Sequence, residues 1–211
     1  MTVTESTEKE KMRACELYNA ADPELVADRL HAQHLLYQFN GSRPDAAEER
    51  LELLFELIAY FGRGSVIQPS FRCDYGYNLL IGRNVFINFD CVFLDCNRIT
   101  IGDDVQIGPA VQIYTAQHPT EAETRRSGLE FALPVTVGDN VWIGGGAILC
   151  PGVTIGADTV IGAGSVVTRD LPPGVIAVGN PCRVLRSVSC ASPKGVLEGS
   201  PERAPKGRKF E

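Results

Sequence analysis

The sequence predicts a mainly β protein, a parallel β-helix built from hexapeptide repeats. Between residues 137 and 167 every sixth position carries a branched apolar residue, and glycine usually follows it. The same pattern appears earlier, at Ile81-Gly82, Ile101-Gly102 and Ile107-Gly108. A period of six fits neither an α-helix nor a single strand, whose periods are about 3.6 and 2. The repeating apolar positions are Val137, Ile143, Leu149, Ile155, Ile161 and Val167.

Geometry explains the period. Each hexapeptide supplies one short strand and one corner, so three of them complete a triangular coil. Successive coils then stack at about 4.8 Å, the spacing between strands. The branched residues point into the prism as a continuous apolar column, and glycine suits the corner because it tolerates a positive φ. A sandwich of short strands is the alternative, but its strands would recur about every 8–12 residues.

The chain divides into three parts. An N-terminal helical segment is expected at 1–63, the β-helix at 64–186 and an extended or disordered tail at 187–211, where apolar residues are too few for a core. Within the first part, Asp22 and Pro23 are typical of the N-cap and first position of a helix. A later helical segment is indicated by the spacing of Leu51, Leu54, Phe55 and Ile58.

Composition excludes several classes of function. The net charge of -6 does not favour nucleic acid or an anionic membrane surface as a partner. No apolar run approaches the roughly 20 residues needed to cross a bilayer, and residues 1–13 show no signal-peptide core. The seven cysteines form no C-x-x-C pair, which favours free thiols in a reducing compartment. We therefore expect a cytoplasmic protein.

The repeat is interrupted once, between Pro119 and Pro134, by a polar segment. Insertions at the corner of a solenoid often build its binding face. His118 stands at the base of the insertion and is the only histidine in the repeat region. It is either a surface histidine beside a proline or a functional group.

Several motifs occur in the order found in one enzyme family. The chain resembles the maltose and galactoside O-acetyltransferases over about residues 8–187. The resemblance is carried by residues 71–78 (FRCDYGYN), 88–90 (NFD), 114–119 (YTAQHP), 134–145 (PVTVGDNVWIGG) and 179–183 (GNPCR), and by residues 10–12 and 16–18 near the N-terminus.

The resemblance implies a homotrimer of left-handed β-helices with active sites in clefts between subunits, transferring acetyl from acetyl-CoA to a sugar hydroxyl. It makes His118 the general base, which would take the hydroxyl proton and return it to the CoA thiolate. Glu130 would orient His118, unless it is a solvated loop glutamate. Asn88 would contact the acceptor hydroxyl, unless it belongs to an asparagine ladder at a corner.

Three further residues are candidates for acceptor binding. Asp74 matches the family's acceptor-binding polar position, and a carboxylate suits vicinal sugar hydroxyls. Cys96 stands where the galactoside branch has a second aspartate, so a galactoside preference does not transfer. Asp22 could supply an acidic contact, but helix capping explains it equally well.

The donor side is assigned by the same resemblance. Trp142 should pack on the pantetheine arm of CoA, and the Gly145 N–H is a candidate donor to the thioester oxyanion. For glycines and other small residues at repeat positions a structural role is the alternative, and for the arginines a solvated one. Further CoA contacts are expected at Ala163, Thr168 and Arg169, with Arg183 and Arg186 on the phosphates.

Other classes are less well supported. A β-helix carbonic anhydrase would need three histidines on zinc, so no metal site is expected. A non-catalytic scaffold would not need His118, Asn88, Glu130 and Trp142 together. An acetyl-cysteine intermediate has no base beside its thiol in the sequence. The main alternative is an acetyl-CoA-dependent transferase with another acceptor, such as an amino sugar, serine or a xenobiotic hydroxyl.

Overall fold

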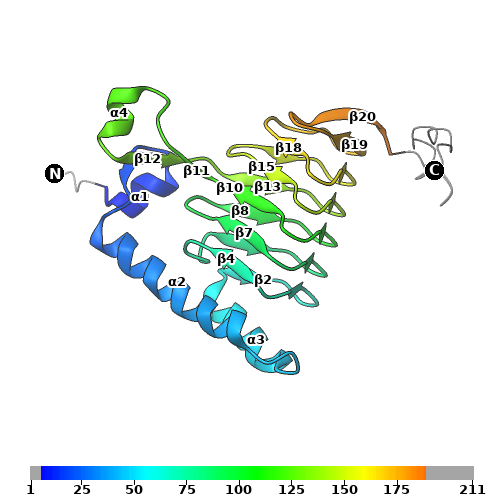
Figure 1. Ribbon diagram of the computed structural model, residues 1–211, viewed down its shortest axis with the longest axis horizontal. Coiled ribbons are helices and arrows are strands. Elements are labelled where there is room, and N and C mark those ends of the chain that lie inside the picture. The colour runs from blue at the N-terminus through cyan, green and yellow to red at the C-terminus, as the bar shows by residue number, and fades with distance from the viewer. Residues whose placement is uncertain (1–5, 189–211) are drawn as a thin grey trace, which may run out of the picture.

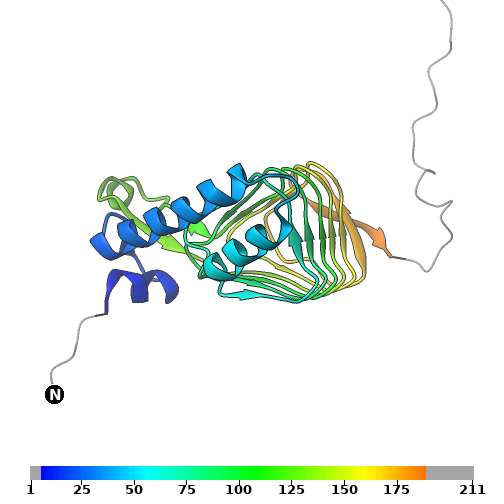
Figure 2. The same ribbon diagram turned by 90° about the horizontal axis from the view of Figure 1, so that it is seen from below.

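The computed structural model describes residues 6–188 and shows a three-faced parallel β-helix with helices at one end (Figures 1 and 2). It confirms the predicted mainly β fold. Face 1 consists of β4 (Phe71–Cys73), β7 (Cys91–Leu94), β10 (Gln112–Tyr114), β15 (Ile148–Leu149) and β18 (Val166–Val167). Face 2 consists of β2 (Tyr60–Phe61), β5 (Leu79–Ile81), β8 (Ile99–Ile101), β13 (Val135–Val137) and β16 (Thr154–Ile155). Face 3 consists of β3 (Val66–Ile67), β6 (Phe86–Ile87), β9 (Gln106–Ile107), β14 (Trp142–Ile143), β17 (Val160–Ile161), β19 (Val175–Val178) and β20 (Arg183–Ser187).

The repeat residues form the predicted apolar column. Ile113, Leu149 and Val167 are register partners on successive coils of face 1, and each is fully buried. Partners such as Ile81 and Ile101 are twenty residues apart in the early coils. Later partners such as Val137 and Ile155 are eighteen apart, which is three hexapeptides. The hexapeptide period is therefore strict in the later coils, where each coil is three hexapeptides long, and is lost in the longer early coils.

Glycine is needed after the repeat residues for a different reason from the one expected. None of Gly62, Gly82 or Gly144 has a positive φ; the left-handed residues come two positions later, as at Gly64 and Asn84. A Cβ on any of these corner glycines would instead lie within 2.2–2.7 Å of an atom in the next coil. The prediction that positive φ selects glycine here was wrong: close stacking of the coils selects it. The complete set is Gly62, Gly82, Gly102, Gly108, Gly138, Gly144, Gly156 and Gly162.

The N-terminal segment contains three helices, α1 (Glu8–Arg13), α2 (Pro23–Gly41) and α3 (Ala47–Leu57). Asp22 caps α2 as predicted, because its carboxylate accepts the Glu24 N–H and Pro23 begins the helix. Helices α2 and α3 cover the first coil of the prism (Figure 2). The coil begins a few residues before the predicted boundary at 63, since β2 already pairs with β5. On α3 and just after it, Leu54 and Ile58 are buried whereas Leu51 and Phe55 are exposed.

The interruption folds into ordered structure rather than a plain loop. It contains α4 (Ala122–Arg126) and β12 (Leu129–Ala132), and β11 (Ala116–Gln117) directly precedes it. β12 pairs antiparallel with β11 on one side and with the N-terminal strand β1 (Tyr18–Asn19) on the other. A small three-stranded sheet thus joins the first part of the chain to the insertion, on the left of Figure 1.

The predicted end of the β-helix at residue 186 falls inside β20, which pairs antiparallel with β19. Most of the predicted tail, 189–211, lies outside the described residues. None of the helices within residues 6–188 has the length and apolar character needed to cross a membrane.

Candidate active site

Two edges of the prism carry the predicted site residues. The 1–2 edge, where the chain leaves face 1 for face 2, holds Asp74 after β4, Asp95 and Cys96 after β7, and the insertion after β10. The 3–1 edge, where the chain leaves face 3 for face 1, holds Asn88 after β6 and Gly145 after β14. Asp74, Cys96 and His118 therefore lie on one edge, because equivalent corners of successive coils lie above one another.

His118 and Glu130 meet at the 1–2 edge. The antiparallel register of β11 and β12 places Gln117 opposite Phe131, so the residues that flank this pair, His118 and Glu130, are brought together. His118 Nδ1 lies 4.0 Å from Glu130 Oε1. The distance is that of an ion pair rather than a hydrogen bond, and such contacts often tighten only when substrate binds. The imidazole is 65% exposed and the carboxylate 23%, so His118 faces solvent and Glu130 lies behind it.

Tyr18 holds the other oxygen of Glu130. Its hydroxyl donates to Glu130 Oε2 at 3.1 Å, and the residue itself is fully buried. In the sequence, Tyr18 stands out only as the last residue of the N-terminal motif at 16–18. No local signal could have assigned its role, because its partner is 112 positions away.

Asp74 is paired with a thiol. The Cys96 thiol lies 3.4 Å from Asp74 Oδ2 and donates to it. Burial raises the pKa of Cys96, with help from the Asp74 charge, so the group remains a protonated donor. Burial likewise raises the pKa of Asp74. Cys96 is only 6% exposed, so it can influence an acceptor through Asp74 rather than by the direct contact that was expected.

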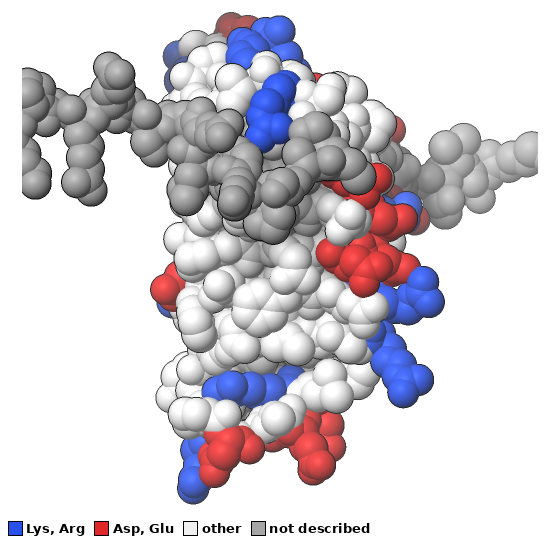
Figure 3. Space-filling model, turned by 90° about the vertical axis from the view of Figure 1, so that its right-hand side faces the viewer, with Lys and Arg blue, Asp and Glu red and all other residues white. Residues whose placement is uncertain are grey.

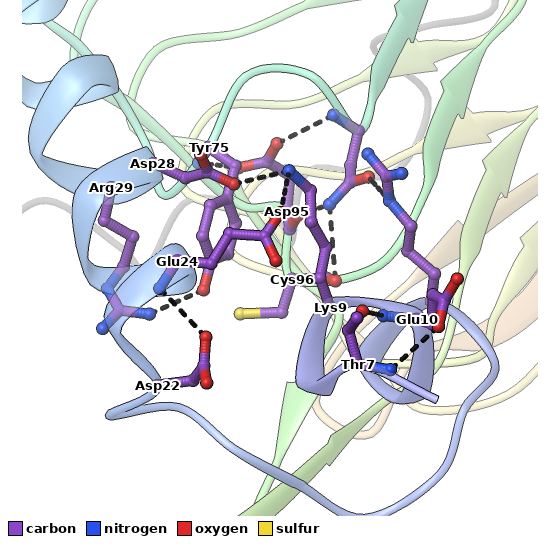
Figure 4. A network of polar contacts seen from close by, with 12 residues as sticks. Thr7, Lys9, Glu10, Asp22, Glu24, Asp28, Arg29, Tyr75, Asp95 and Cys96 are labelled. Atoms are coloured by element: carbon purple, nitrogen blue, oxygen red, sulfur yellow. Dashed lines mark hydrogen bonds and ion pairs between the residues drawn. The ribbon is translucent and has the colours of Figure 1, made fainter. Parts of the chain in front are cut away.

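Asp95 supports this corner from inside. Its Oδ1 accepts the backbone N–H groups of Asp74 and Tyr75 at 2.9 and 2.8 Å. The side chain is fully buried, and burial raises the pKa of Asp95 to about 7. Arg29 on α2 donates to the Tyr75 hydroxyl at 2.6 Å, which ties the helix to the same corner (Figure 4). Neither Arg29 nor Asp95 was predicted to contribute.

Asp22 acts as a helix cap in the structure. Its Oδ1 accepts the Glu24 N–H at 3.0 Å, the contact drawn as a dashed line in Figure 4. Of its two predicted roles, the described contacts account for capping.

A cavity of about 630 Å³ opens beside Asp74. It lies between α2 and face 1, with Tyr37, Asn40, Arg72 and Leu94 also in its wall. A second cavity, of about 510 Å³, is lined by Arg13, Tyr77, Asn78 and Arg98 and contains none of the predicted site residues. Of these two cavities, the one at Asp74 contains a residue predicted to bind the acceptor.

The predicted donor residues are distributed over both edges and face 3. Trp142 points outward from face 3 and is 54% exposed. Ala163 stacks on Gly144 at the 3–1 edge, one coil beyond Gly145. Thr168 and Arg169 follow β18 at the 1–2 edge, and Arg183 and Arg186 are exposed on β20.

His118 and Asn88 are not brought together within one chain. Asn88 sits at the 3–1 edge, where its side-chain oxygen accepts the Phe89 N–H at 2.8 Å. Face 1 separates the two residues, and its strand β7 alone, four residues long, spans about 13 Å. A single site that uses both residues has to join edges from two copies.

Known proteins with this architecture are similar to the chain in sequence and in structure. The maltose acetyltransferase hexapeptide capping motif matches residues 11–62, and the bacterial transferase hexapeptide (six repeats) matches residues 134–169. A maltose O-acetyltransferase from Clostridium difficile has a similar structure, with a TM-score of 0.87 and 50% identity, covering 88% of this chain and 100% of that one. The chain belongs to the hexapeptide-repeat acetyltransferases of the maltose and galactoside type.

Two further members of the family are close relatives. Nodulation protein L of Rhizobium meliloti is 55% identical over 178 residues, which cover 84% of this chain and 97% of that protein. A galactoside acetyltransferase in complex with coenzyme A has a TM-score of 0.85 and 41% identity, covering 88% of this chain and 92% of that one. The family resemblance predicted from the motifs is confirmed, and with it an acetyltransferase.

Proposed function

We propose that the protein transfers an acetyl group from acetyl-CoA to a sugar hydroxyl, with His118 as general base. The observation that carries the proposal is the solvent-facing imidazole of His118 backed by the Glu130 carboxylate, on the same edge as Asp74. An exposed imidazole suits a group that receives a proton from a bound acceptor. The half-buried carboxylate behind it suits a group that stabilises the imidazolium.

The residues suit a direct transfer. His118 takes the acceptor hydroxyl proton as the oxygen attacks the thioester carbon, and it returns this proton to the thiolate when the carbon–sulfur bond breaks. Gly145 offers a backbone N–H to the oxyanion. Asp74 accepts from neighbouring hydroxyls of the sugar.

A direct route is also favoured over an acetyl-cysteine intermediate. Burial raises the pKa of Cys91 to about 11 and also raises the pKa of Cys96 and Cys150. These sulfurs are therefore thiols at neutral pH, whereas the thiolate is the nucleophile.

The surface near the 3–1 edge fits coenzyme A. Trp142 offers a half-exposed aromatic face for the pantetheine arm. Beside it, Gly144, Gly145 and Gly146 carry no side chains, so a thin chain can approach the backbone. The described arginines of β20, Arg183 and Arg186, are exposed and would meet the phosphates.

A homotrimer would complete the site. Joining the 1–2 edge of one copy to the 3–1 edge of the next places His118 opposite Asn88, and three copies close the ring. The outward residues of β3, β6, β9, β14 and β17 on face 3 are uncharged: Val66, Phe86, Gln106, Trp142 and Val160. The charged residues of this face, Arg183 and Arg186, lie on the antiparallel strand β20 at its end. The side of the molecule in Figure 3 likewise shows few charges across its middle, as a surface between copies requires.

A cytoplasmic location is proposed as well, because all six described cysteines are free thiols.

The test is thiol release from acetyl-CoA across a panel of maltose, glucose, galactosides, glucosamine, serine and chloramphenicol. We expect release with a sugar, and His118→Ala should lower kcat by about 10²–10⁴-fold while acetyl-CoA affinity is kept. His34→Ala, which removes an exposed histidine on α2, is the control and should keep full activity. Wild-type turnover by the His118 variant would refute the mechanism, and activity only with serine or chloramphenicol would refute the sugar acceptor.

A further inference from the structure

Tyr18 is the part of the N-terminal segment that reaches the proposed catalytic pair. In the antiparallel pairing of β1 with β12, Tyr18 is the register partner of Glu130. The two oxygens of that carboxylate are divided between two groups: Oε1 faces His118 at 4.0 Å and Oε2 accepts from Tyr18 at 3.1 Å. The glutamate is therefore held from behind by a residue of another element.

The hydroxyl of Tyr18 is a permanent donor. The side chain is fully buried in a cluster with Met12, Leu25, Cys96 and Ala132. Burial, the largest cause, raises the pKa of Tyr18 well above its usual range, and the charge of Glu130 adds to the effect. A buried hydroxyl is costly without a hydrogen bond, and phenylalanine would fill the same apolar cluster. The hydroxyl therefore serves its polar partners rather than packing.

A glutamate carboxylate needs such an anchor. Rotation about its last side-chain bond is broad, so packing alone does not fix which oxygen faces the histidine. The hydrogen bond to Oε2 fixes that rotation and presents Oε1 to Nδ1 of His118. Cys96 lies beside the same hydroxyl and donates to Asp74. The Tyr18 hydroxyl is therefore linked to Asp74 through Cys96 and to His118 through Glu130.

We propose that Tyr18 is a positioning residue that acts on His118 through Glu130, which makes strand β1 a working part of the active site. The inference rests on the proposed function, in which His118 is the base. It goes beyond that function by assigning a role to a residue that touches neither substrate nor the reacting atoms.

The first experiment compares Tyr18→Phe with a matched control. Tyr18→Phe should lower kcat about tenfold, the size expected for one hydrogen bond to a charged group, and leave KM for acetyl-CoA unchanged. Tyr77→Phe is the control: Tyr77 packs against the same cluster, but its hydroxyl makes no hydrogen bond to Glu130. Unchanged kcat in Tyr18→Phe, or an equal loss in both variants, would overturn the proposal.

A double-mutant cycle tests the route of the effect. If Tyr18 acts through Glu130, Tyr18→Phe should cost little in a Glu130→Gln background, so the two losses should not add. Equal tenfold losses in both backgrounds would mean that Tyr18 acts elsewhere and would overturn the assignment.

A spectroscopic measurement keeps this test independent of turnover. A carboxylate beside Nδ1 favours the imidazole tautomer protonated there, and ¹⁵N NMR of the full chain distinguishes the tautomers of His118. Tyr18→Phe should reduce that tautomer toward the level in Glu130→Gln, and Tyr77→Phe should not. An unchanged tautomer would overturn the positioning role, whereas an active His118→Ala would overturn only the proposed function.

Discussion

The two edges of the prism that carry the site are built in opposite ways. At the 3–1 edge Gly108, Gly144 and Gly162 bring successive coils so close that a Cβ would lie 2.5–2.7 Å from the next coil. At the 1–2 edge the corners instead carry buried polar side chains, with Asp95 and Thr115 fully buried and Asn97 nearly so. Asn97 Nδ2 donates to the carbonyls of Met12 and Ala132, which fastens both the N-terminal segment and the insertion to this edge.

The difference shows how one repeat can supply two kinds of surface. A bare edge of stacked glycines allows a thin ligand to lie against the backbone. An edge with long polar corners can hold groups for acid–base work in fixed positions. A proposed site made from one edge of each kind needs two copies of the chain, and this requirement can be tested directly.

The largest expected effect comes from mixing two inactive variants. His118→Ala and Asn88→Ala should each lower kcat by about 10²–10⁴-fold. Because the two residues lie on different edges, co-expressed subunits should regain about a quarter of wild-type activity, from neighbouring pairs that unite the two intact edges. Thiol release by the mixed oligomer is the measurement. No recovery, with mixed oligomers verified by differential tags, would place both residues in one chain's site.

The next effect concerns the tightness of the bare edge. A Cβ on Gly144 would lie 2.5 Å from the Ala163 nitrogen, so Gly144→Ala should lower the free energy of unfolding by about 1–3 kcal/mol. Gly41, at the end of α2, has nothing within 4 Å of an added Cβ, and Gly41→Ala should be neutral or stabilising by up to about 1 kcal/mol. Denaturant unfolding at fixed protein concentration compares them, and equal stabilities would contradict the close-stacking explanation.

The buried carboxylate of the polar edge predicts a pH dependence. The pKa of Asp95 in the folded protein is about 7, above the roughly 3.9 expected when unfolded. The folded state therefore binds the proton more tightly, and the free energy of unfolding should fall as the pH rises between these values, by about 1.4 kcal/mol per unit at most.

Asp95→Asn removes that titration. The difference in unfolding free energy between wild type and this variant should shrink steadily from pH 4.5 to 6.5, a window that lies within about 4–7. Urea unfolding at three pH values at one protein concentration would show it. A constant difference would mean that Asp95 does not titrate in this range.

The smallest effect should come from the donor surface. Trp142→Ala removes an exposed side chain from face 3, so stability should hardly change while the Kd for coenzyme A rises about tenfold. The control is Tyr60→Ala on face 2, which also removes an exposed aromatic ring and should leave binding unchanged. Calorimetric titration measures both, and equal affinities in the three proteins would exclude the pantetheine contact.

Much of this molecule could be predicted from local patterns. In the later coils the six-residue period marks strand, corner and core position, because the same inward position recurs every eighteen residues. Asp22 was predicted as a cap from its neighbours alone, and the structure confirms it. The corner glycines show where local patterns stop being sufficient. Their positions could be predicted from the repeat, but the need for glycine comes from the close approach of the next coil.

Local patterns were sufficient to find the repeat, the apolar column, the break at the insertion and the candidate base, His118, beside it. The folded chain alone shows that β1 pairs with β12, that Tyr18 donates to Glu130, that Cys96 donates to Asp74, and that face 1 lies between Asn88 and His118. The cause is distance along the chain. Each hexapeptide contains its own buried position, so the period can be seen in any part of the repeat. A single hydrogen bond such as that from Tyr18 to Glu130 joins residues 112 positions apart and leaves no local pattern in either segment.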